Sequence, residues 1–472
     1  MNYVPKKIES AAPRIDSVVA EIRRRIAARS LMPGAKLPSV RAIAKTMDLS
    51  VSTVVEAYER LVAEGVIRSR PGSGFYVTSV LAPLSLAELA PKLDRAVDPF
   101  WVSRLALEAQ DDMVKPGCGW LPPSWMPEDA LRRALRLLSR ADPDILTDYG
   151  TPLGLLPLRQ LLARRLADEG VHTGAEQILL VDSGTLAIDL LCRFLLEPGQ
   201  TVLVDDPCYF NFHALLRAHR VKIVSVPYMA DGPDVALFEQ VLKEHEPRLY
   251  ITNSAVHNPT GATLSAVKAH RILMLAERAG LTIIEDNIFA DFEYERSPRL
   301  AAFDGLDRVV QIGSFSKTLS ASARCGYIVA RRDWIEPLTD LKIAANFAGN
   351  RLAEALVLNV LKDGSYRRHM EGLKARLSGA RVRVANQLNS IDVSPWLMPQ
   401  AGLFLWCKLP QNVDAANVAR HALTKNMVLA PGNVFSGSQT ASRFMRFNVS
   451  QCDHPDFAAI LSSAISAAVN EI

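Results

Sequence analysis

Two stretches decide the fold of this chain: LYITNSAVHNPTG (residues 249–261) and VVQIGSFSKTL (residues 309–319). Each begins with the apolar and β-branched residues that are typical of a buried strand, and each then continues into small and polar residues. Asn258 and Lys317 therefore follow predicted strands, and Asp286 follows a third strand between them. Because ligands of parallel α/β sheets bind beyond the carboxyl ends of the strands, we expect these three side chains to meet in one site.

The surrounding sequence repeats this arrangement. From about residue 116 onward, apolar runs alternate with amphipathic helices, which indicates an α/β fold with a mainly parallel central sheet. Helices are predicted at residues 154–168 and 263–279. The predicted strands are residues 177–181, 201–205, 222–226, 248–253, 281–285 and 308–312.

The three polar residues match the chemistry of pyridoxal phosphate. That cofactor needs an amine for its aldehyde, a carboxylate for its pyridine nitrogen and a donor for its phenolic oxygen. Lys317, Asp286 and Asn258 supply these groups in turn. Each motif alone has an ordinary structural explanation, such as a turn or a helix start, but their combination and order are specific. The sequence therefore predicts pyridoxal 5'-phosphate as a cofactor.

Other residues near the predicted strand ends suit the phosphate of that cofactor. A helix that opens directly after a strand offers backbone N–H groups to an anion. Hydroxyl and guanidinium groups close to the lysine can complete the neutralisation of the phosphate charge. The residues expected at the phosphate are Ser183, Gly184, Thr185, Ser314, Ser316 and Arg324.

Two more residues are predicted to contact the ligands. Tyr209, in the segment Asp206-Pro207-Cys208-Tyr209, is expected to stack on the pyridine ring. Arg446 offers a guanidinium for the α-carboxylate of a substrate or effector. A surface ion pair is the alternative explanation for Arg446.

Composition limits the class of protein. With 472 residues, of which 49% are hydrophobic and 22% charged, the chain is expected to form two to four globular domains. No stretch reaches the roughly 20 apolar residues of a membrane helix and the N-terminus lacks a secretory signal, so a cytoplasmic protein without membrane contact is expected. The six cysteines are scattered and no spacing resembles a zinc site, which predicts reduced, mostly buried thiols and no metal.

The first eighty residues have a different pattern. They hold 13 Lys and Arg against 7 Asp and Glu, whereas the remainder holds 41 against 43, so the basic excess is N-terminal. The segment PGAKLPSVRAIAKTMDLSVSTVVEAYERLVAEGVIRSRPGSGFYV (residues 33–77) contains helix caps, a helix-ending glycine and a turn between two short apolar runs. The predicted elements are a helix at residues 13–29, helices capped by Ser39 and Ser50, and strands at residues 66–70 and 75–77.

Three helices followed by a two-stranded wing form a unit that reads DNA, with the third helix in the major groove. Small hydroxyl residues at the start of that helix allow close approach to phosphates, and arginines add salt-dependent contacts to the backbone. A helical protein-interaction domain or a solvated basic helix is the alternative. The residues predicted to contact double-stranded DNA are Arg41, Ser50, Ser52, Thr53, Arg68 and Arg70.

Residues 33–77 resemble the winged helix of the GntR family nearly throughout. The motifs HNPTG and SFSKTL, with the Glu285-Asp286 pair, resemble the fold-type-I, aspartate aminotransferase-like family across almost all of residues 116–472. The fusion of the two resembles the MocR subfamily of bacterial transcription regulators. The resemblance implies an α+β winged helix-turn-helix head at residues 10–79, a linker at residues 80–115, and an α/β body at residues 116–472 with a smaller C-terminal subdomain.

The same resemblance implies features of assembly and regulation. It implies a homodimer with sites at the subunit interface, in which Tyr149 reaches the phosphate of the neighbouring subunit. It also implies that the head docks against the partner's body. The cofactor or its adduct is then expected to modulate transcription.

Two departures from the family pattern bear on mechanism. Phe289 stands where family enzymes often carry a tyrosine that hydrogen-bonds the phenolic oxygen, which leaves Asn258 as the main partner of that oxygen and makes efficient turnover less secure. Val51 and Val55 stand where some relatives place arginines for base contacts. Direct base readout is therefore expected to depend on fewer residues.

These observations favour a DNA-binding transcription regulator whose body senses an amino compound or pyridoxal phosphate itself. The alternative is an active aminotransferase with a vestigial head, since Lys317, Asp286 and Arg446 leave residual transamination open. A protein-interaction module built on an inactive enzyme is disfavoured, because among the cofactor-contact positions only Phe289 departs from the pattern.

Overall fold

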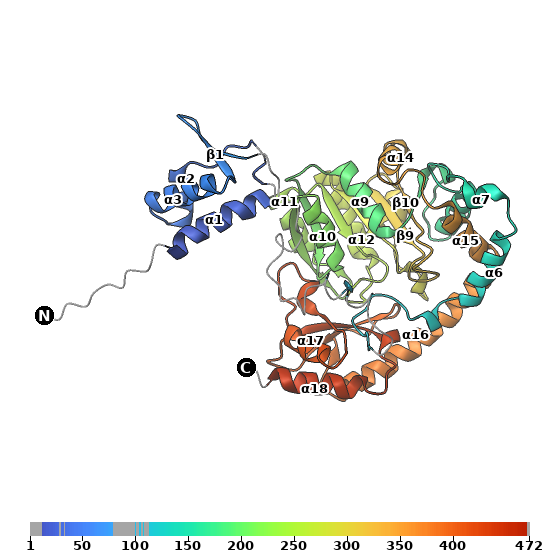
Figure 1. Ribbon diagram of the computed structural model, residues 1–472. Coiled ribbons are helices and arrows are strands. Elements are labelled where there is room, and N and C mark those ends of the chain that lie inside the picture. The colour runs from blue at the N-terminus through green and yellow to red at the C-terminus, as the bar shows by residue number, and fades with distance from the viewer. Residues whose placement is uncertain are drawn as a thin grey trace. The chain divides into compact units, whose positions relative to one another are not determined.

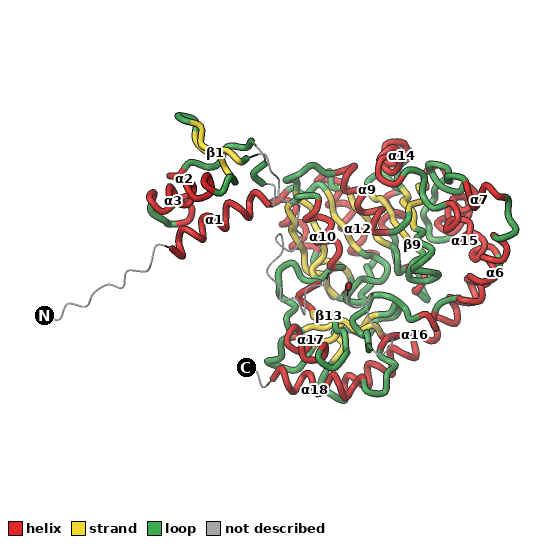
Figure 2. Tube along the Cα trace, viewed as in Figure 1, coloured by secondary structure: helices red, strands yellow, loops and turns green. Residues whose placement is uncertain are grey.

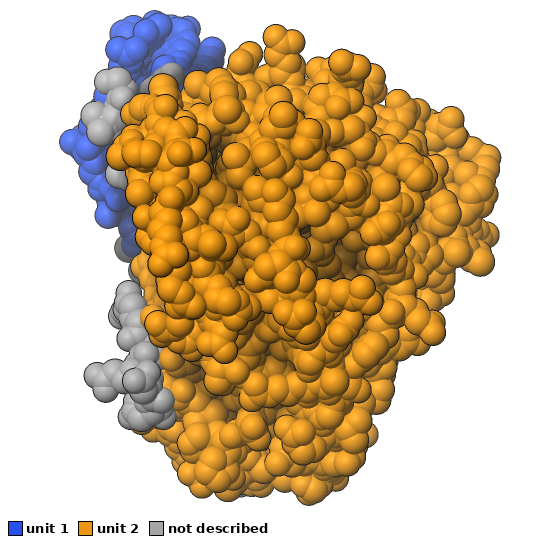
Figure 3. Space-filling view, turned by 90° about the vertical axis from the view of Figure 1, so that its right-hand side faces the viewer, with its two compact units in different colours: residues 1–93 blue, residues 94–472 orange. Residues whose placement is uncertain are grey.

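The computed structural model describes residues 12–27, 30–32, 34–78, 100, 103–104, 107 and 113–469 of the 472-residue chain. The chain divides into two compact units, residues 1–93 and residues 94–472, which Figure 3 colours separately. Most of the predicted linker lies outside the described residues, so the domain boundaries stay predictions.

In its described residues, the N-terminal unit has three helices and a two-stranded wing (Figure 1). Ser39 and Ser50 cap α2 and α3, because their hydroxyls accept from the backbone N–H groups of Ala42 and Thr53. Gly65, with a φ of 71°, follows α3 in a left-handed conformation that glycine adopts without strain. The wing strands β1 and β2 pair antiparallel. The elements are α1 Ala12–Ala27, α2 Val40–Met47, α3 Val51–Ala63, β1 Ile67–Arg70 and β2 Gly74–Val77.

One hydrophobic cluster holds this unit together. Val54, Tyr58 and Leu61 are fully buried and recur at the spacing of one helix face. The Tyr58 ring meets Phe75 of the wing edge to face at 5.0 Å, and its hydroxyl donates to the Pro38 carbonyl oxygen at 3.0 Å. The wing and the start of α2 are thereby fixed to α3, as the predicted winged helix requires.

An eight-stranded sheet forms the centre of the C-terminal unit (Figure 2). Its order is β3-β10-β9-β8-β7-β4-β5-β6. The neighbours β5, β4, β7, β8 and β9 pair in parallel, so the predicted mainly parallel sheet is confirmed. The strands are β3 Ile178–Val181, β4 Thr201–Asp206, β5 Lys222–Met229, β6 Gly232–Pro233, β7 Leu249–Thr252, β8 Thr282–Asp286, β9 Val309–Ser314 and β10 Gly326–Val329.

β10 is a strand that the sequence analysis did not predict. It lies between β3 and β9 and runs antiparallel to both. A Cβ on Gly326 would lie 2.9 Å from the Gly313 carbonyl oxygen and 3.1 Å from the Gly184 nitrogen, so glycine allows β10 to approach the start of α9.

Helices cover both faces of this sheet. Ile284 of β8 belongs to a core that includes apolar residues of α9, α10 and α14. Tyr250 of β7 packs edge to face on Phe238 of α11 at 5.1 Å. The α-helices are α6 Glu128–Leu138, α7 Pro143–Thr147, α8 Leu156–Ala167, α9 Gly184–Leu195, α10 Phe210–Ala218, α11 Val235–His245, α12 Ala266–Ala279, α13 Leu300–Asp304, α14 Arg332–Asn346, α15 Arg351–Lys362 and α16 Ser365–Asn389. The 3₁₀ turns are η2 Pro123–Trp125, η3 Ala175–Gln177, η4 Ala290–Phe292, η5 Gly432–Val434 and η6 Val449–Gln451.

The residues after α16 form the predicted smaller C-terminal subdomain. Its four-stranded antiparallel sheet has the order β11-β12-β14-β13. The long helix α16 runs from the neighbourhood of α6 and α15 to this subdomain (Figure 1). The elements are β11 Ser394–Pro395, β12 Phe404–Lys408, α17 Ala415–Leu423, β13 Ala430–Pro431, β14 Phe444–Asn448 and α18 Phe457–Val469.

Two expectations from the composition concern the state of the cysteines and the presence of a membrane-spanning helix. All six cysteines lie in the described part of the chain, are buried and take part in no disulfide. Burial raises the pKa of the Cys118 thiol to about 12, so this thiol stays protonated at neutral pH. In the described ranges, no helix is both long enough and apolar enough for a membrane crossing.

Candidate functional site

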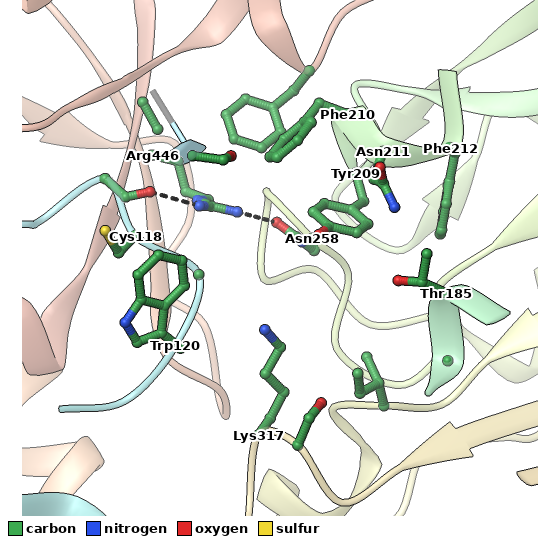
Figure 4. Close-up of a pocket in the computed structure, with 18 of the residues that line it drawn as sticks. Cys118, Trp120, Thr185, Tyr209, Phe210, Asn211, Phe212, Asn258, Lys317 and Arg446 are labelled. Atoms are coloured by element: carbon green, nitrogen blue, oxygen red, sulfur yellow. Dashed lines mark hydrogen bonds between the residues drawn. The ribbon is translucent and has the colours of Figure 1, made fainter. Parts of the chain in front are cut away.

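A cavity of about 440 Å³ lies between the carboxyl ends of the parallel strands and the C-terminal subdomain (Figure 4). This volume suits a cofactor or another small ligand. Ten of the twelve ligand-contact residues predicted for the body line it. They are Ser183, Gly184, Thr185, Tyr209, Asn258, Asp286, Ser316, Lys317, Arg324 and Arg446.

Lys317 lies just after β9, and its amine points into the cavity (Figure 4). The backbone N–H of Leu319 donates to the Phe315 carbonyl oxygen at 2.9 Å and fixes the turn that carries the lysine. Burial, followed by the nearby charge of Arg446, lowers the pKa of Lys317 to about 8. A useful fraction of the amine is therefore neutral and nucleophilic near neutral pH.

Asp286 is the last residue of β8. Its Oδ1 accepts from the Ile288 N–H at 3.1 Å, and the Asn253 side chain donates to its carbonyl oxygen at 3.1 Å. Burial raises the pKa of Asp286 to about 6. The folded protein therefore favours the neutral form of Asp286. Its contribution to the free energy of unfolding is complete below the ordinary pKa of an unfolded aspartate, and it is lost as the pH rises through about 6. The adjacent Glu285 instead accepts from the Leu300 N–H at the start of α13, so only Asp286 serves the cavity.

A buried polar cluster holds the loop that carries Asn258. The His257 ring stacks on Tyr228 at 3.7 Å, and its Nδ1 lies 2.8 Å from the Thr260 Oγ1. The His257 Nε2 lies 3.5 Å from the buried Asp205 carboxylate. These contacts fix the loop, and Asn258 lines the cavity from it (Figure 4).

Arg446 reaches the cavity from β14 of the C-terminal subdomain. Its Nη1 donates to the Asn258 Oδ1 at 2.9 Å, and its Nη2 donates to the Gly117 carbonyl oxygen at 2.7 Å (Figure 4). The guanidinium lies 4.2 Å from the Phe404 ring centroid and 4.7 Å from that of Phe435. Burial lowers the pKa of Arg446 to about 10, so it remains charged at neutral pH. Because Arg446 is only 2% exposed, a surface ion pair does not explain it.

The start of α9 forms another side of the cavity. Ser183 caps this helix by accepting from the Leu186 N–H at 3.0 Å. The first N–H groups of a helix lack partners inside the helix and attract anions. Arg324 lines the same cavity with a φ of 38°, a conformation that is strained for a residue with a side chain. A helix start and a guanidinium together suit a phosphate.

Ser314 and Tyr149 do not line the cavity. The Ser314 hydroxyl donates to the Cys325 carbonyl oxygen at 3.1 Å and accepts from the Ser316 N–H at 3.3 Å, so it supports the turn before the lysine. Tyr149 is 72% exposed and packs on Phe347 with ring centroids 4.9 Å apart.

The sequence analysis missed several aromatic residues of the lining. Trp120, Phe210 and Phe435 all line the cavity. Trp120 follows Gly117, where a Cβ would lie 2.5 Å from the Leu429 carbonyl carbon. The sequence signal for this part of the lining was a glycine close to a tryptophan. Glycine is common where two backbone segments approach closely, which would have placed Trp120 beside another segment of the chain.

The predicted DNA-contact hydroxyls gather at the start of α3 in the N-terminal unit. The Ser50 Oγ lies 2.9 Å from the Ser52 Oγ and 2.7 Å from the Thr53 Oγ1. Val51 and Val55 are exposed on the same helix. The helix start therefore presents hydroxyls, and the two valines add apolar surface beside them.

The predicted DNA-contact arginines lie on other elements of this unit. Arg41 of α2 is exposed, as are Arg68 and Arg70 of β1. The Arg70 guanidinium lies 4.7 Å from the centroid of the Tyr76 ring in the wing. Long exposed arginines of this kind suit contacts with phosphates.

Comparison with known families assigns the C-terminal unit. Residues 122–463 match the family model Aminotransferase class I and II, which is well over half of the chain. The chain belongs to the aminotransferase class I and II family. Residues 14–77 match the model of bacterial regulatory proteins of the gntR family, so this family member carries a regulatory-protein region at its N-terminus.

Individual proteins resemble the whole chain or its body. The uncharacterized HTH-type transcriptional regulator YdcR of Escherichia coli is 28% identical over 92% of this chain and 94% of its own length. The HTH-type transcriptional regulator NorG of Staphylococcus aureus is 27% identical over 86% of this chain and 94% of its own. The crystal structure of LysN, an alpha-aminoadipate aminotransferase from Thermus thermophilus complexed with N-(5'-phosphopyridoxyl)-L-leucine, has a TM-score of 0.73 and 24% identity, covering 82% of this chain and 100% of its own. The body therefore has an aminotransferase fold, which implies dependence on pyridoxal phosphate.

Proposed function

We propose that this protein is a DNA-binding transcription regulator whose body binds pyridoxal 5'-phosphate and senses an amino compound. The proposal is carried by one observation: Lys317, Asp286, Asn258 and Arg446 meet in one cavity of a chain that also has a gntR-type winged helix. Relatives named transcriptional regulators, similar over most of the chain, support it. The predicted boundaries at residues 79/80 and 115/116 are part of the proposal.

The lining residues fit the cofactor. The buried Asp286 carboxylate suits the protonated pyridine nitrogen, and Asn258 suits the phenolic oxygen. Lys317 is the amine for the covalent link, and Tyr209 is the ring for stacking. When bound, the cofactor supplies an electron sink for the chemistry of amino groups. The residues proposed to hold its phosphate are Ser183, Gly184, Thr185, Ser316 and Arg324, with Ser314 behind them.

Arg446 is proposed to bind the carboxylate of the amino compound. Its Nε is buried and has no hydrogen-bond partner among the described residues, so a donor remains for a ligand. A carboxylate can also replace the Asn258 oxygen at Nη1, which would free the Asn258 side chain for the cofactor.

A homodimer is part of the proposal. Tyr149 and Phe347 form an exposed aromatic pair, and Leu146 and Leu352 are exposed as well. Exposed apolar groups of this kind are typical of protein interfaces. In the dimer, Tyr149 is proposed to reach the phosphate held by the partner subunit.

The alternative function is an active aminotransferase with a vestigial head. Phe289 is buried and packs edge to face on Phe404 at 5.5 Å. Because a phenylalanine has no hydroxyl, this position offers no hydrogen bond to the phenolic oxygen of the cofactor. A steady-state transamination assay with a panel of amino acids, run beside selection of DNA duplexes that the full chain binds, separates the two functions. Fast turnover without specific DNA binding would favour the alternative.

Removal of a head arginine is expected to weaken DNA binding in a salt-dependent way. Arg41→Ala and Arg70→Ala should each reduce the slope of log affinity against log salt by about 0.9 for one lost phosphate contact. Anisotropy titrations of a labelled duplex at several salt concentrations measure the slope. Arg132→Ala, an exposed site on α6 of the body, is the control. If neither head variant changes the slope, the backbone contacts have been assigned to the wrong residues.

Covalent attachment of the cofactor to the apoprotein is expected to become faster as the pH rises, in two steps. The Asp286 carboxylate pairs with a pyridinium only when ionised, and its pKa is about 6. The Lys317 amine attacks only when neutral, and its pKa is about 8. Asp286→Asn should lose the lower step and keep the upper one. Stopped-flow absorbance from about pH 5 to 9 measures both, and an unchanged lower step in the variant would contradict the role of Asp286.

A further inference from the structure

Aromatic side chains form one side of the cavity beside Arg446. Tyr209 and Phe210 meet at 4.9 Å between ring centroids, and Phe210 meets Phe435 at 6.0 Å. We call these three residues the aromatic wall. Figure 4 shows Phe210 beside the Arg446 end of the cavity and Trp120 on the opposite side of the space above Lys317. A ligand that reaches from Lys317 to Arg446 therefore passes between aromatic faces.

The aromatic wall joins two parts of the C-terminal unit. Tyr209 and Phe210 lie at the start of α10, next to the central sheet, whereas Phe435 follows η5 in the C-terminal subdomain. Phe435 is fully buried and packs edge to face on Trp406 at 5.8 Å, so its position is fixed. Phe210 is only half-buried, and it lines the cavity. Its ring can therefore pack against an apolar side chain of a ligand.

The charges of the lining are all assigned by the proposed function. Four described lining residues carry charge: Asp286, Lys317, Arg324 and Arg446. They are proposed for the pyridine nitrogen, the aldehyde, the phosphate and the carboxylate of the effector. A second charge on the effector would have no partner among the described lining residues. Burial of an unpaired charge is far more costly than burial of apolar surface.

We infer that the effector is an α-amino acid with one carboxylate and an apolar, preferably aromatic, side chain, selected by Phe210 and Phe435. The inference rests on the proposed function, because it takes Arg446 as the carboxylate site. The apolar side chain gains by leaving water, and an aromatic ring gains further from edge-to-face or offset packing on Phe210. A dicarboxylic or dibasic amino acid would place its second charge against the aromatic wall.

The test is an absorbance titration of the full chain loaded with pyridoxal phosphate. L-phenylalanine, L-leucine, L-glutamate and L-lysine are added separately, and the change of the cofactor band gives a half-saturating concentration for each. L-phenylalanine is expected to act at a concentration at least roughly 100-fold below those of L-glutamate and L-lysine, with L-leucine closer to L-phenylalanine. The readout uses no DNA, so a failure of the regulator function does not affect it.

Variants of the aromatic wall test which residues select the ligand. Phe210→Ala should raise the half-saturating concentration of L-phenylalanine by roughly 10-fold, and Phe435→Leu should do so by less, because both remove packing area. Phe210→Arg should shift the preference toward L-glutamate. Phe303→Ala, at a residue that is 59% exposed on α13 and outside the cavity lining, is the matched control. Retention of the cofactor band shows that each variant is folded.

The inference is overturned by either of two results. One is that L-glutamate or L-lysine acts at the same or a lower concentration than L-phenylalanine in the wild type. The other is that no amino acid of the panel changes the band of a protein that holds the cofactor.

Discussion

Lys317→Ala is expected to lose all covalent attachment of pyridoxal phosphate. Lys317 follows β9 and is the one lysine among the described lining residues, with its amine partly neutral because burial lowers its pKa to about 8. The wild type should be yellow, and borohydride should fix the cofactor to Lys317 as a stable secondary amine. The variant should release its cofactor completely on denaturation after the same treatment. Mass spectrometry of the intact protein measures the difference as presence or absence of one phosphopyridoxyl group.

A matched lysine variant controls for general effects of the substitution. Lys243 is 72% exposed in its side chain and pairs with Glu239 on α11. Lys243→Ala should therefore keep the borohydride-fixed cofactor in full. If borohydride still fixes the cofactor to the Lys317→Ala protein, another lysine is the attachment site.

The parts of the fold that the sequence predicted best are those in which local pattern and burial agree. The six predicted strands are present because each contains a short apolar run, and the strands at the centre of the sheet are buried on both faces, as in β7 and β9. Neighbouring side chains of a strand point to opposite sides, so Glu285 of β8 caps α13 whereas Asp286 lines the cavity. Motif order identified Asp286, and strand geometry explains why its neighbour has another role.

The features that sequence reasoning missed depend on contacts between distant segments. β10 is an antiparallel strand in a mainly parallel sheet, and Gly326 allows it to lie against the start of α9, a contact over more than a hundred residues. Phe435 contacts Phe210 across a similar distance in the chain. The hydrogen bond between Arg446 and Asn258 is also long-range, and it places the proposed carboxylate site and the proposed phenolic-oxygen donor in direct contact. No periodicity within one segment reports such contacts.

Effector-dependent DNA binding is expected to disappear in Lys317→Ala while basal DNA binding remains. An effector changes DNA affinity only if it binds two states of the protein unequally. In the wild type, Lys317 would hold the cofactor through its amine, and the amine of an effector bound at Arg446 would compete with Lys317 for the same position. Without the lysine, the body cannot alternate between a lysine-linked and an effector-linked state. The wild-type response should be roughly 5- to 150-fold in DNA affinity, which corresponds to a coupling free energy of about 1–3 kcal/mol.

The structure indicates how the two ends of the cavity can be coupled. The backbone next to Lys317 is held by α16, because the His369 Nε2 lies 3.0 Å from the Thr318 carbonyl oxygen. Farther along the same helix, Arg381 donates to the Gly402 carbonyl oxygen at 2.9 Å, just before β12, a strand of the sheet that carries Arg446. A ligand that extends through the cavity from the Lys317 end to Arg446 therefore contacts two elements that α16 connects. Phe289 favours this role, since slow turnover would prolong the effector-linked state.

Arg446→Ala should respond to the effector only at much higher concentration, whereas Lys317→Ala should not respond at all. Loss of the guanidinium removes a buried, charge-assisted contact to the carboxylate, so the half-saturating effector concentration should rise by roughly 100-fold. Lys317→Ala keeps Arg446 but cannot exchange its covalent link. Fluorescence anisotropy of a labelled duplex, selected for binding from random sequence, measures affinity with and without the amino acid that shifts the cofactor band. A wild-type response in Lys317→Ala would mean that the covalent exchange is not the switch, and the cofactor would then have a structural role.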